Sequence, residues 1–304
     1  KINTSRSVCA MIAINIINII TLPLISRFGG DNAARGYLLV TVLYGGIFTL
    51  CHWFCFAKTK EVVQPPKRES VSLKTQFRAA AQNRPYLIAL TGQFLFGVTL
   101  YGRNADLLYY FKYVEGNENL FTVYSMILII PSILGAAAFP FVFEKLGNKG
   151  HTAALFSAGT GVSLIALYFF SAVTAPVPFY AFAALSQFFF CGFNTAIYAI
   201  VPDCVEYGEW KTGVRNDGFQ YAFVSLGNKL GMAIGTSALA GVLGALQFAP
   251  NQAQNPAVQT AMHWAFSLIP GVLWLVTAAV LFFYRISKRS YNRIMSELNA
   301  KKTV

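Results

Sequence analysis

Residues Val201–Gly235 read VPDCVEYGEWKTGVRNDGFQYAFVSLGNKLGMAIG. The stretch begins with a run of charged side chains and continues into a long apolar segment that holds one lysine, Lys229, well inside it. A cation at the centre of a bilayer helix costs roughly 2.5–3.5 kcal/mol on insertion scales. A charged run followed by an apolar helix with an internal lysine favours a protein that moves a solute across a membrane.

The composition of the whole chain indicates a membrane protein. Of 304 residues, 55% are hydrophobic and 12% are charged, against roughly 25% charged in soluble proteins. A membrane helix needs about 20 mostly apolar residues, and eight stretches qualify: Ser7–Ser26, Gly36–Ala57, Tyr86–Phe111, Leu120–Phe143, Thr152–Ala172, Val177–Ile200, Phe219–Phe248 and Trp264–Tyr284. These runs lack the alternation of a membrane barrel. The predicted fold class is therefore all-α, a polytopic membrane protein.

The same composition argues against other classes of protein. The net charge of +12 arises mainly from basic residues in short loops between apolar runs, where the positive-inside rule accounts for them, so we expect no nucleic-acid binding. The five cysteines form no CxxC pair, and His52, His151 and His263 are scattered. We therefore predict no metal site, no cofactor and no catalytic residue, and we do not expect an enzyme.

Loop charges predict the orientation. Basic residues gather in the connection after the second apolar stretch and in the C-terminal tail, whereas Ser171–Pro176 and Ala249–His263 contain no Asp, Glu, Lys or Arg. The positive-inside rule then places this basic connection and the C-terminal tail on the cytoplasmic side of a bacterial inner membrane.

The connection between the second and third stretches divides the chain. Within it, Ser70–Asn83 has the pattern of a short amphipathic helix at the inner membrane surface. Two stretches precede it and six follow, which favours a protein of two six-helix bundles whose first four helices precede Lys1. We expect residues 1–57 to be the end of the first bundle, 58–85 a cytoplasmic linker, and 86–304 the second bundle with a cytoplasmic tail.

Polar residues inside the third stretch share one helix face. Thr99, Arg103, Asp106 and Tyr110 are spaced by four, three and four residues. An ion pair between Arg103 and Asp106 would lower the cost of both charges and serve only packing. Alternatively, both residues line a cavity, where Arg103 could donate two hydrogen bonds to a hydroxyl or carboxylate of a substrate.

Lys229 lies on a polar stripe beside a ridge of glycines. The stripe is Tyr221, Ser225, Lys229, Met232 and Thr236, and the ridge is Gly227, Gly231 and Gly235. Small residues at this spacing are typical of close helix contact. Lys229 either neutralises a buried acid such as Asp106 or takes part in a cation or substrate site.

Two further polar sets have two interpretations each, and Arg6 has one. Gln187, Asn194 and Tyr198 share a face that could bind a neighbouring helix or line a cavity. By its position, Arg6 is an anchor at the inner membrane surface. The charged run is either a solvated loop or a set of ion pairs that close the inner side in one state; it comprises Asp203, Glu206, Glu209, Lys211 and Arg215.

The spacing D-x-x-E-Y-x-E-x-K-x-x-x-R from Asp203 to Arg215 resembles the helix 10–11 region of the glycoside–pentoside–hexuronide:cation symporters, the melibiose permease family of the major facilitator superfamily. LLYYFKYVEG (Leu107–Gly116), and NTSR followed by ITLPLISRFGG near the start, are similar to the same family. The resemblance covers essentially the whole chain, as helices 5 to 12 of a twelve-helix protein.

The resemblance implies transport of a sugar, glycoside or uronide, coupled to Na⁺, Li⁺ or H⁺ by alternating access. It implies that Arg6 contacts the sugar, that Ser225 lies on the sugar side and that Lys229 tunes the cation site. It also implies that the charged run forms an inner gate. Asn194 stands where melibiose permease has a tryptophan, and the family's carboxylates lie mostly on helices 1, 2 and 4.

The expected partners are a small sugar, a monovalent cation and the lipid bilayer, and the protein is expected to be a monomer. A non-transporting receptor or scaffold on the same fold is the main alternative. It would not need Lys229, Arg103 and Asp106 at membrane depth. A membrane enzyme acting on lipid is disfavoured, because the sequence offers no pairing of nucleophile and base.

Overall fold

The computed structural model describes residues 2–30, 32–60 and 72–302. Every regular element within these residues is a helix, which confirms the predicted all-α membrane fold. The chain divides into two compact units, one of Lys1–Ile12 with Ser72–Val304 and one of Ala13–Val71. The boundary after Val71 falls inside the predicted linker, of which residues 61–71 lie outside the described part.

The unit Ala13–Val71 is a helical hairpin. It contains most of α1 (Ile2–Gly29) and all of α2 (Ala33–Lys58). The Asn32 side chain caps the first turn of α2, and the hydroxyls of Thr21 and Tyr44 lie 2.9 Å apart between the helices. Most other side chains of the hairpin are apolar and exposed, as expected for helices that face lipid or further helices.

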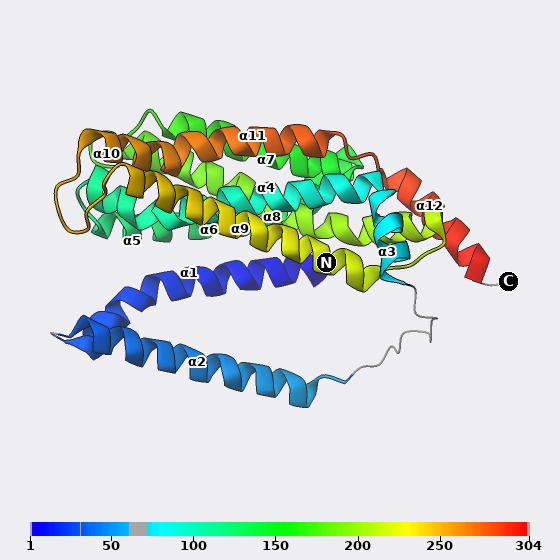
Figure 1. The fold of residues 1–304 in the computed structure, drawn as a ribbon, viewed down its shortest axis with the longest axis horizontal. Coiled ribbons are helices and arrows are strands. Elements are labelled where there is room, and N and C mark those ends of the chain that lie inside the picture. The colour runs from blue at the N-terminus through cyan, green and yellow to red at the C-terminus, as the bar shows by residue number, and fades with distance from the viewer. Residues whose placement is uncertain (1, 31, 61–71, 303–304) are drawn as a thin grey trace. The chain divides into compact units, whose positions relative to one another are not determined.

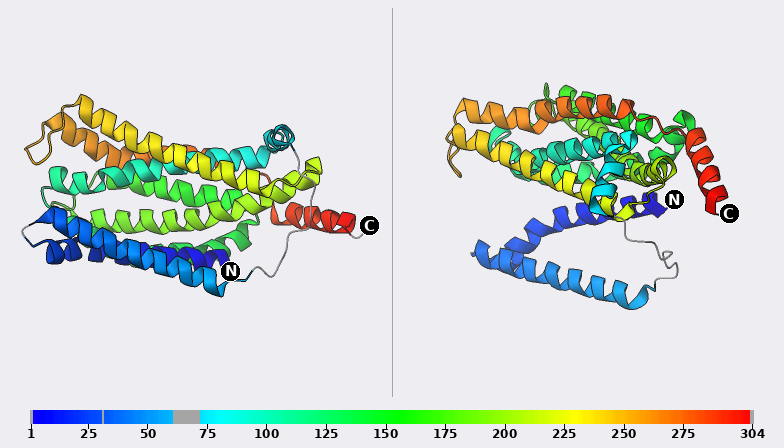
Figure 2. Two further views of the ribbon diagram at one scale, coloured as in Figure 1. Left: turned by 60° about the horizontal axis from the view of Figure 1, so that its bottom comes forward. Right: turned by 45° about the vertical axis from the view of Figure 1, so that its right-hand side comes forward.

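The larger unit is a bundle of long helices with shorter helices at its ends. Its elements are α3 (Leu73–Ala81), α4 (Arg84–Tyr109), the π-helical turn η1 (Tyr110–Val114), α5 (Asn119–Ile127), α6 (Ile129–Leu146), α7 (Lys149–Leu167), α8 (Pro176–Thr212), α9 (Asp217–Ala245), α10 (Pro256–His263), the π-helical turn η2 (Trp264–Leu268), α11 (Ile269–Phe282) and α12 (Lys288–Lys302). In Figure 1, α3 and α12 lie at one end of this bundle, and α5 and α10 lie at the other. The turned views in Figure 2 agree. We call these the α12 end and the α10 end.

Six helices of the described residues are long and apolar enough to cross a bilayer. Two of the eight predicted stretches, now α4 and α9, are not among the six. They contain 26 and 29 residues, about 39 and 44 Å at 1.5 Å per residue, so their length suffices. Their polar side chains and glycines make them less apolar than the other six.

These two helices pack directly on each other, in the most extensive helix pair of the described residues. A Cβ on Gly231 of α9 would overlap the carbonyl oxygen of Phe94, and one on Gly235 would overlap that of Val98. Gly97 of α4 lies equally close to the carbonyl of Asn228. The residue numbers rise together, so the helices run parallel, and the glycine ridge of α9 lies in the interface.

Aromatic side chains fill the centre of the bundle. Phe96 of α4, Phe193 of α8 and Trp274 of α11 pack together, with centroids of Phe193 and Trp274 4.7 Å apart. Glycines admit large neighbours here as well, since Gly192 faces the ring of Phe156 and Gly159 faces that of Phe189. This core joins α4, α7, α8 and α11.

The predicted end of the sixth stretch is wrong. The stretch predicted to end at Ile200 continues as α8 through Pro202 to Thr212. It ends at Gly213, whose φ of +71° favours glycine. Asp203, Glu206, Glu209 and Lys211 therefore lie on the last turns of a helix and not in a loop. Contacts with other helices stabilise this extension.

Gly231→Ala is expected to destabilise the protein by about 1–3 kcal/mol, because the added methyl forces α4 and α9 apart. Gly241→Ala in the same helix is the matched control. A Cβ there meets nothing within 4 Å, so this variant should be neutral or gain up to about 1 kcal/mol from helix propensity. Thermal unfolding of both variants in detergent measures the difference, and equal shifts would contradict the described packing.

Candidate functional site

A buried ion pair joins α7 to the end of α8. The Nζ atom of Lys149 lies 2.7 Å from Oδ1 of Asp203 and donates a second bond of 3.1 Å to the carbonyl of Ala199. The side chains of Lys149 and Asp203 are 23% and 5% exposed. Asn148 caps α7 and so places Lys149 in its first turn. The Ala199 carbonyl lies in the same turn of α8 as Asp203, so the ammonium group reaches both acceptors.

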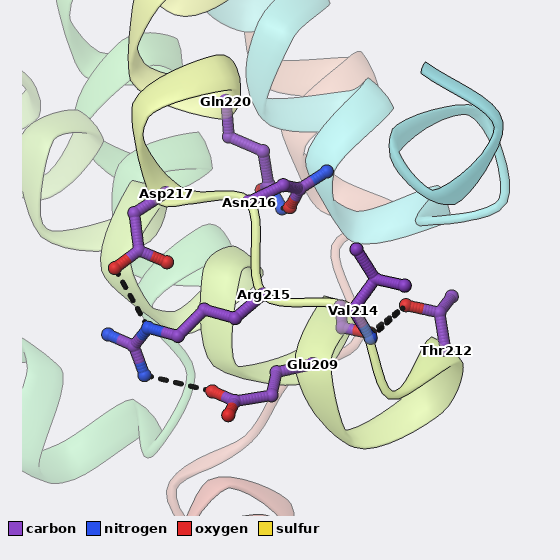
Figure 3. A network of polar contacts seen from close by, with 8 residues as sticks. Glu209, Thr212, Val214, Arg215, Asn216, Asp217 and Gln220 are labelled. Carbon is purple, nitrogen blue, oxygen red and sulfur yellow. Dashed lines mark hydrogen bonds and ion pairs between the residues drawn. The ribbon is translucent and has the colours of Figure 1, made fainter. Parts of the chain in front are cut away.

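Arg215 connects α8 to α9. Its Nη1 lies 2.8 Å from Oε2 of Glu209, and its Nε lies 2.8 Å from Oδ2 of Asp217. Figure 3 shows the guanidinium between the two carboxylates, across the short connection that begins at Gly213. A planar guanidinium can bridge two acids in this way. The connection is thereby held at both sides.

The short helix α3 is fastened to the same connection. Lys211 donates to the carbonyl of Gln82 at 2.9 Å, and the Asn216 amide donates to the carbonyl of Gln76 at 3.1 Å. The predicted amphipathic helix is therefore present, although shorter than Ser70–Asn83, and it contacts the helices of the bundle at the α12 end.

Helix α12 docks on α8 through two side-chain bonds. Trp210 donates from Nε1 to Oε2 of Glu297 at 2.6 Å. The hydroxyl of Tyr291 bonds to Glu206, and burial, together with this bond, raises the pKa of Tyr291. Since Tyr291 keeps its proton, it donates to Glu206. All five members of the predicted charged run thus lie at the α12 end, each with a partner on another element or beyond the end of α8.

The polar stripe of α9 faces away from the glycine contact. Ser225 and Lys229 are exposed, and the nearby Gly231 is buried. Residues two positions apart are separated by about 200° around a helix axis. Lys229 and Gly231 therefore occupy opposite faces of α9. Lys229 lies 12 residues after Asp217 and 16 before Ala245. No carboxylate of the described residues forms an ion pair with it.

Of the two interpretations of Arg103 and Asp106, the ion pair does not form in this structure. Arg103 donates from Nε to the carbonyl of Phe266 at 2.8 Å and from Nη2 to the hydroxyl of Tyr124 at 2.6 Å. Phe266 lies in the π-helical turn η2, and the residue four positions later, Pro270, has no N–H to donate to its carbonyl. Arg103 donates to this carbonyl, a contact that sequence spacing within α4 did not reveal.

The remaining predicted site residues lie apart from this contact. Asp106 is 0% exposed, and neither carboxylate oxygen has a hydrogen-bond partner within residues 2–30, 32–60 and 72–302. It therefore does not neutralise Lys229. Asn194 of α8 is half-buried. The backbone of Arg6 lies in α1, and its side chain lies outside the described part of the structure.

The sequence analysis missed Lys149, Trp210 and Glu297. Lys149 follows Asn148 in a short turn between two apolar stretches, on the same predicted side as the acidic run. A basic residue in such a turn is a usable signal for a partner to buried acids. Trp210 and Glu297 gave no comparable signal, because they are distant in sequence and meet only through the docking of α12.

Comparison with known proteins gives one family over nearly the whole chain. Residues 1–288 match the family model described as MFS/sugar transport protein. The isoprimeverose transporter of Lactiplantibacillus pentosus is 29% identical over 295 residues, which are 94% of this chain and 60% of that protein.

Two other relatives match over similar lengths. The glucuronide carrier protein homolog of Escherichia coli (strain K12) is 26% identical over 314 residues, covering 100% of this chain and 66% of that protein. The uncharacterized symporter YjmB of Bacillus subtilis (strain 168) is 26% identical over 309 residues, covering 99% and 65%. The chain thus spans 60% to 66% of the length of these relatives.

Asp203→Asn and Lys149→Gln are each expected to destabilise the protein by about 3 kcal/mol, because each leaves the partner buried without its counter-charge. The double variant should cost clearly less than the sum of the two. Arg293→Gln is the control: it breaks the Arg293–Glu297 pair, in which Arg293 is 76% exposed, and should cost about 1 kcal/mol or less. A double-mutant cycle on unfolding in detergent measures these terms, and strict additivity would contradict a direct pair.

Proposed function

We propose, from the premise that this chain belongs to the MFS/sugar transport protein family, that it takes part in secondary active transport of a sugar, glycoside or uronide. The family is one of transport proteins and not of enzymes, as the sequence analysis expected. Coupling to a monovalent cation, Na⁺ or H⁺, and alternating access are part of the proposal. The names of an isoprimeverose transporter and a glucuronide carrier homolog support a glycoside or a uronide as substrate.

Lys229 is the observation that carries the proposal. It lies about 18 Å along α9 from the first residue and about 24 Å from the last, so it is far from both ends of a membrane-length helix. It is exposed on the bundle and unpaired among the described carboxylates. A charge at this depth in a membrane faces a cavity or a partner and not lipid. A transport pathway provides such a cavity.

Substrate contacts are proposed for three further residues. Ser225 lies one turn before Lys229 and offers a hydroxyl, and Asn194 of α8 offers an amide. Both types of group bind sugar hydroxyls. Arg6 is proposed to add a cationic donor to the substrate, and Lys229 to tune the coupling-cation site. Arg103 and Asp106 can join a cavity only in a conformation that releases Arg103 from Phe266 and Tyr124.

The α12 end is proposed to be the cytoplasmic side and to carry the inner gate. Basic residues gather there, on α3, α7, α12 and the α8–α9 connection, whereas at the α10 end the described residues outside the long helices include one lysine, Lys112, and no arginine. The ion pairs of Lys149 and Arg215 would hold this end closed in one state and exchange partners in the other. We further propose a monomer in the bacterial inner membrane.

A receptor or scaffold on the same fold is the competing function. It could keep the Asp203–Lys149 and Glu209–Arg215 pairs for stability. It would have no use for an unpaired lysine facing a cavity, so neutralising Lys229 would leave its binding partner and stability unchanged. Uptake measurements with Lys229 variants therefore separate the two functions.

The intact protein in phospholipid vesicles is expected to accumulate a glycoside under an inward Na⁺ or H⁺ gradient. Lys229→Ala and Arg215→Ala should reduce accumulation at least tenfold, because one removes the cavity cation and the other opens the gate network. Arg293→Ala is the matched control for Arg215, since it also removes an arginine paired with a glutamate at the α12 end, and it should retain accumulation. Uptake of radiolabelled sugar measures all three, and unchanged uptake in both test variants would refute the assignments.

A further inference from the structure

Asp106 is the single acidic residue in the eight apolar stretches of the sequence. In α4 it is 0% exposed, and both carboxylate oxygens lack a hydrogen-bond partner among the residues that the structure describes. An isolated carboxylate in such a place costs several kcal/mol relative to water. Its presence therefore needs an explanation in terms of a ligand or a change of charge state.

The nearest cation is already bound elsewhere. Arg103, one helical turn earlier, is the charged group whose field acts on Asp106. Its guanidinium donates to the Phe266 carbonyl at 2.8 Å and to the Tyr124 hydroxyl at 2.6 Å, and its Cζ lies 4.7 Å from the centre of the Phe266 ring. The Phe266 carbonyl and the Tyr124 hydroxyl thus compete with Asp106 for the N–H donors of Arg103.

The other elements around Asp106 bring few titratable groups. The nearest is Tyr110 of η1, one turn later, whose hydroxyl donates to Glu115 at 2.6 Å. Glu115 itself accepts from Ser171 and from backbone N–H groups after it. Helix α5 contributes Tyr124, and α10 contributes His263, whose ring centre lies 5.7 Å from that of Tyr110. The sequences of η2 and α11, and of α9 beyond Lys229, contain no Asp, Glu, His, Lys or Arg.

We propose that Asp106 is a proton-binding site of this bundle, protonated in the conformation described and controlled by Arg103. While Arg103 is bonded to Phe266 and Tyr124, the neutral acid is the form that needs no counter-charge. Proton release breaks the carboxyl O–H bond and passes the proton to water. The carboxylate that remains then pairs with Arg103, since residues three apart on a helix can meet. The ligand of the site is thus a proton, and the Arg103 cation takes its place as the partner of Asp106 when the proton leaves.

The first test needs no transport. In the intact protein in phospholipid vesicles, infrared difference spectroscopy during a pH titration should show the C=O band of a protonated carboxyl group that is lost in Asp106→Asn. Glu115→Gln should keep this band. If the wild-type band is absent near neutral pH, or persists unchanged in Asp106→Asn, the proposal is refuted. Asp106→Glu retains a carboxyl group and should keep a band at a shifted position. This variant separates loss of the carboxyl group from misfolding as the cause of the lost band in Asp106→Asn.

The second test addresses Arg103. Tyr124→Phe removes one of its two acceptors and should favour the Arg103–Asp106 pair. The titration midpoint of the Asp106 band should then fall by about one pH unit, a tenfold loss of proton affinity. Tyr113→Phe, at the same end of the bundle, is the matched control and should leave the midpoint unchanged. An unaltered midpoint in Tyr124→Phe would overturn the role of Arg103.

A third arm rests on the proposed function. If the protein accumulates glycoside under a pH gradient, Asp106→Asn should abolish that accumulation while Tyr113→Phe retains it. Accumulation that persists in Asp106→Asn would overturn a part for this proton in transport. A wild-type protein that moves no glycoside would refute the proposed function, whereas the infrared titration would still decide whether Asp106 binds a proton.

Discussion

Backbone contact between α4 and α9 is the constraint on which the rest of the bundle depends. Gly231 and Gly235 let the carbonyls of Phe94 and Val98 approach where any Cβ would collide. This contact fixes the rotation of α9, so that Lys229 lies on the opposite face. It also holds α4 within the bundle, where Asp106 becomes buried. The two charged features of the proposed transport chemistry thus follow from the absence of side chains at two positions.

Prolines and charged side chains act together in this structure. Pro270 has no N–H to donate to the Phe266 carbonyl four residues earlier, and Arg103 donates to that carbonyl from α4. Near Pro202, Lys149 supplies a donor to the Ala199 carbonyl and a counter-charge to Asp203. Within lipid, a backbone group left unbonded costs several kcal/mol. Each of these cations therefore binds a carbonyl of one helix from a neighbouring helix, which rigidifies the bundle near both ends.

The sequence sufficed where local pattern decides structure. Apolar stretches gave the helices, and four-residue spacing placed Gly231 and Gly235 in a close contact. It failed where residues distant in the chain decide. Local spacing allowed an Arg103–Asp106 pair, but Arg103 donates instead to Phe266 and Tyr124, 163 and 21 residues away. Likewise α8 extends beyond the end of its apolar stretch, because Lys149 and α12 stabilise its charged last turns.

The parallel pairing of α4 and α9 also bears on biosynthesis. The first residues of the two helices, Arg84 and Asp217, are separated by 217 − 84 = 133 positions. At 5–20 residues per second, a ribosome needs roughly 7–27 s to make that length. During this time α4, a weakly apolar helix that contains Arg103 and Asp106, has neither α9 nor the Phe266 carbonyl to pack against. This topology therefore requires that α4 be retained at the translocon, or shielded by an insertase, until α9 has been synthesised.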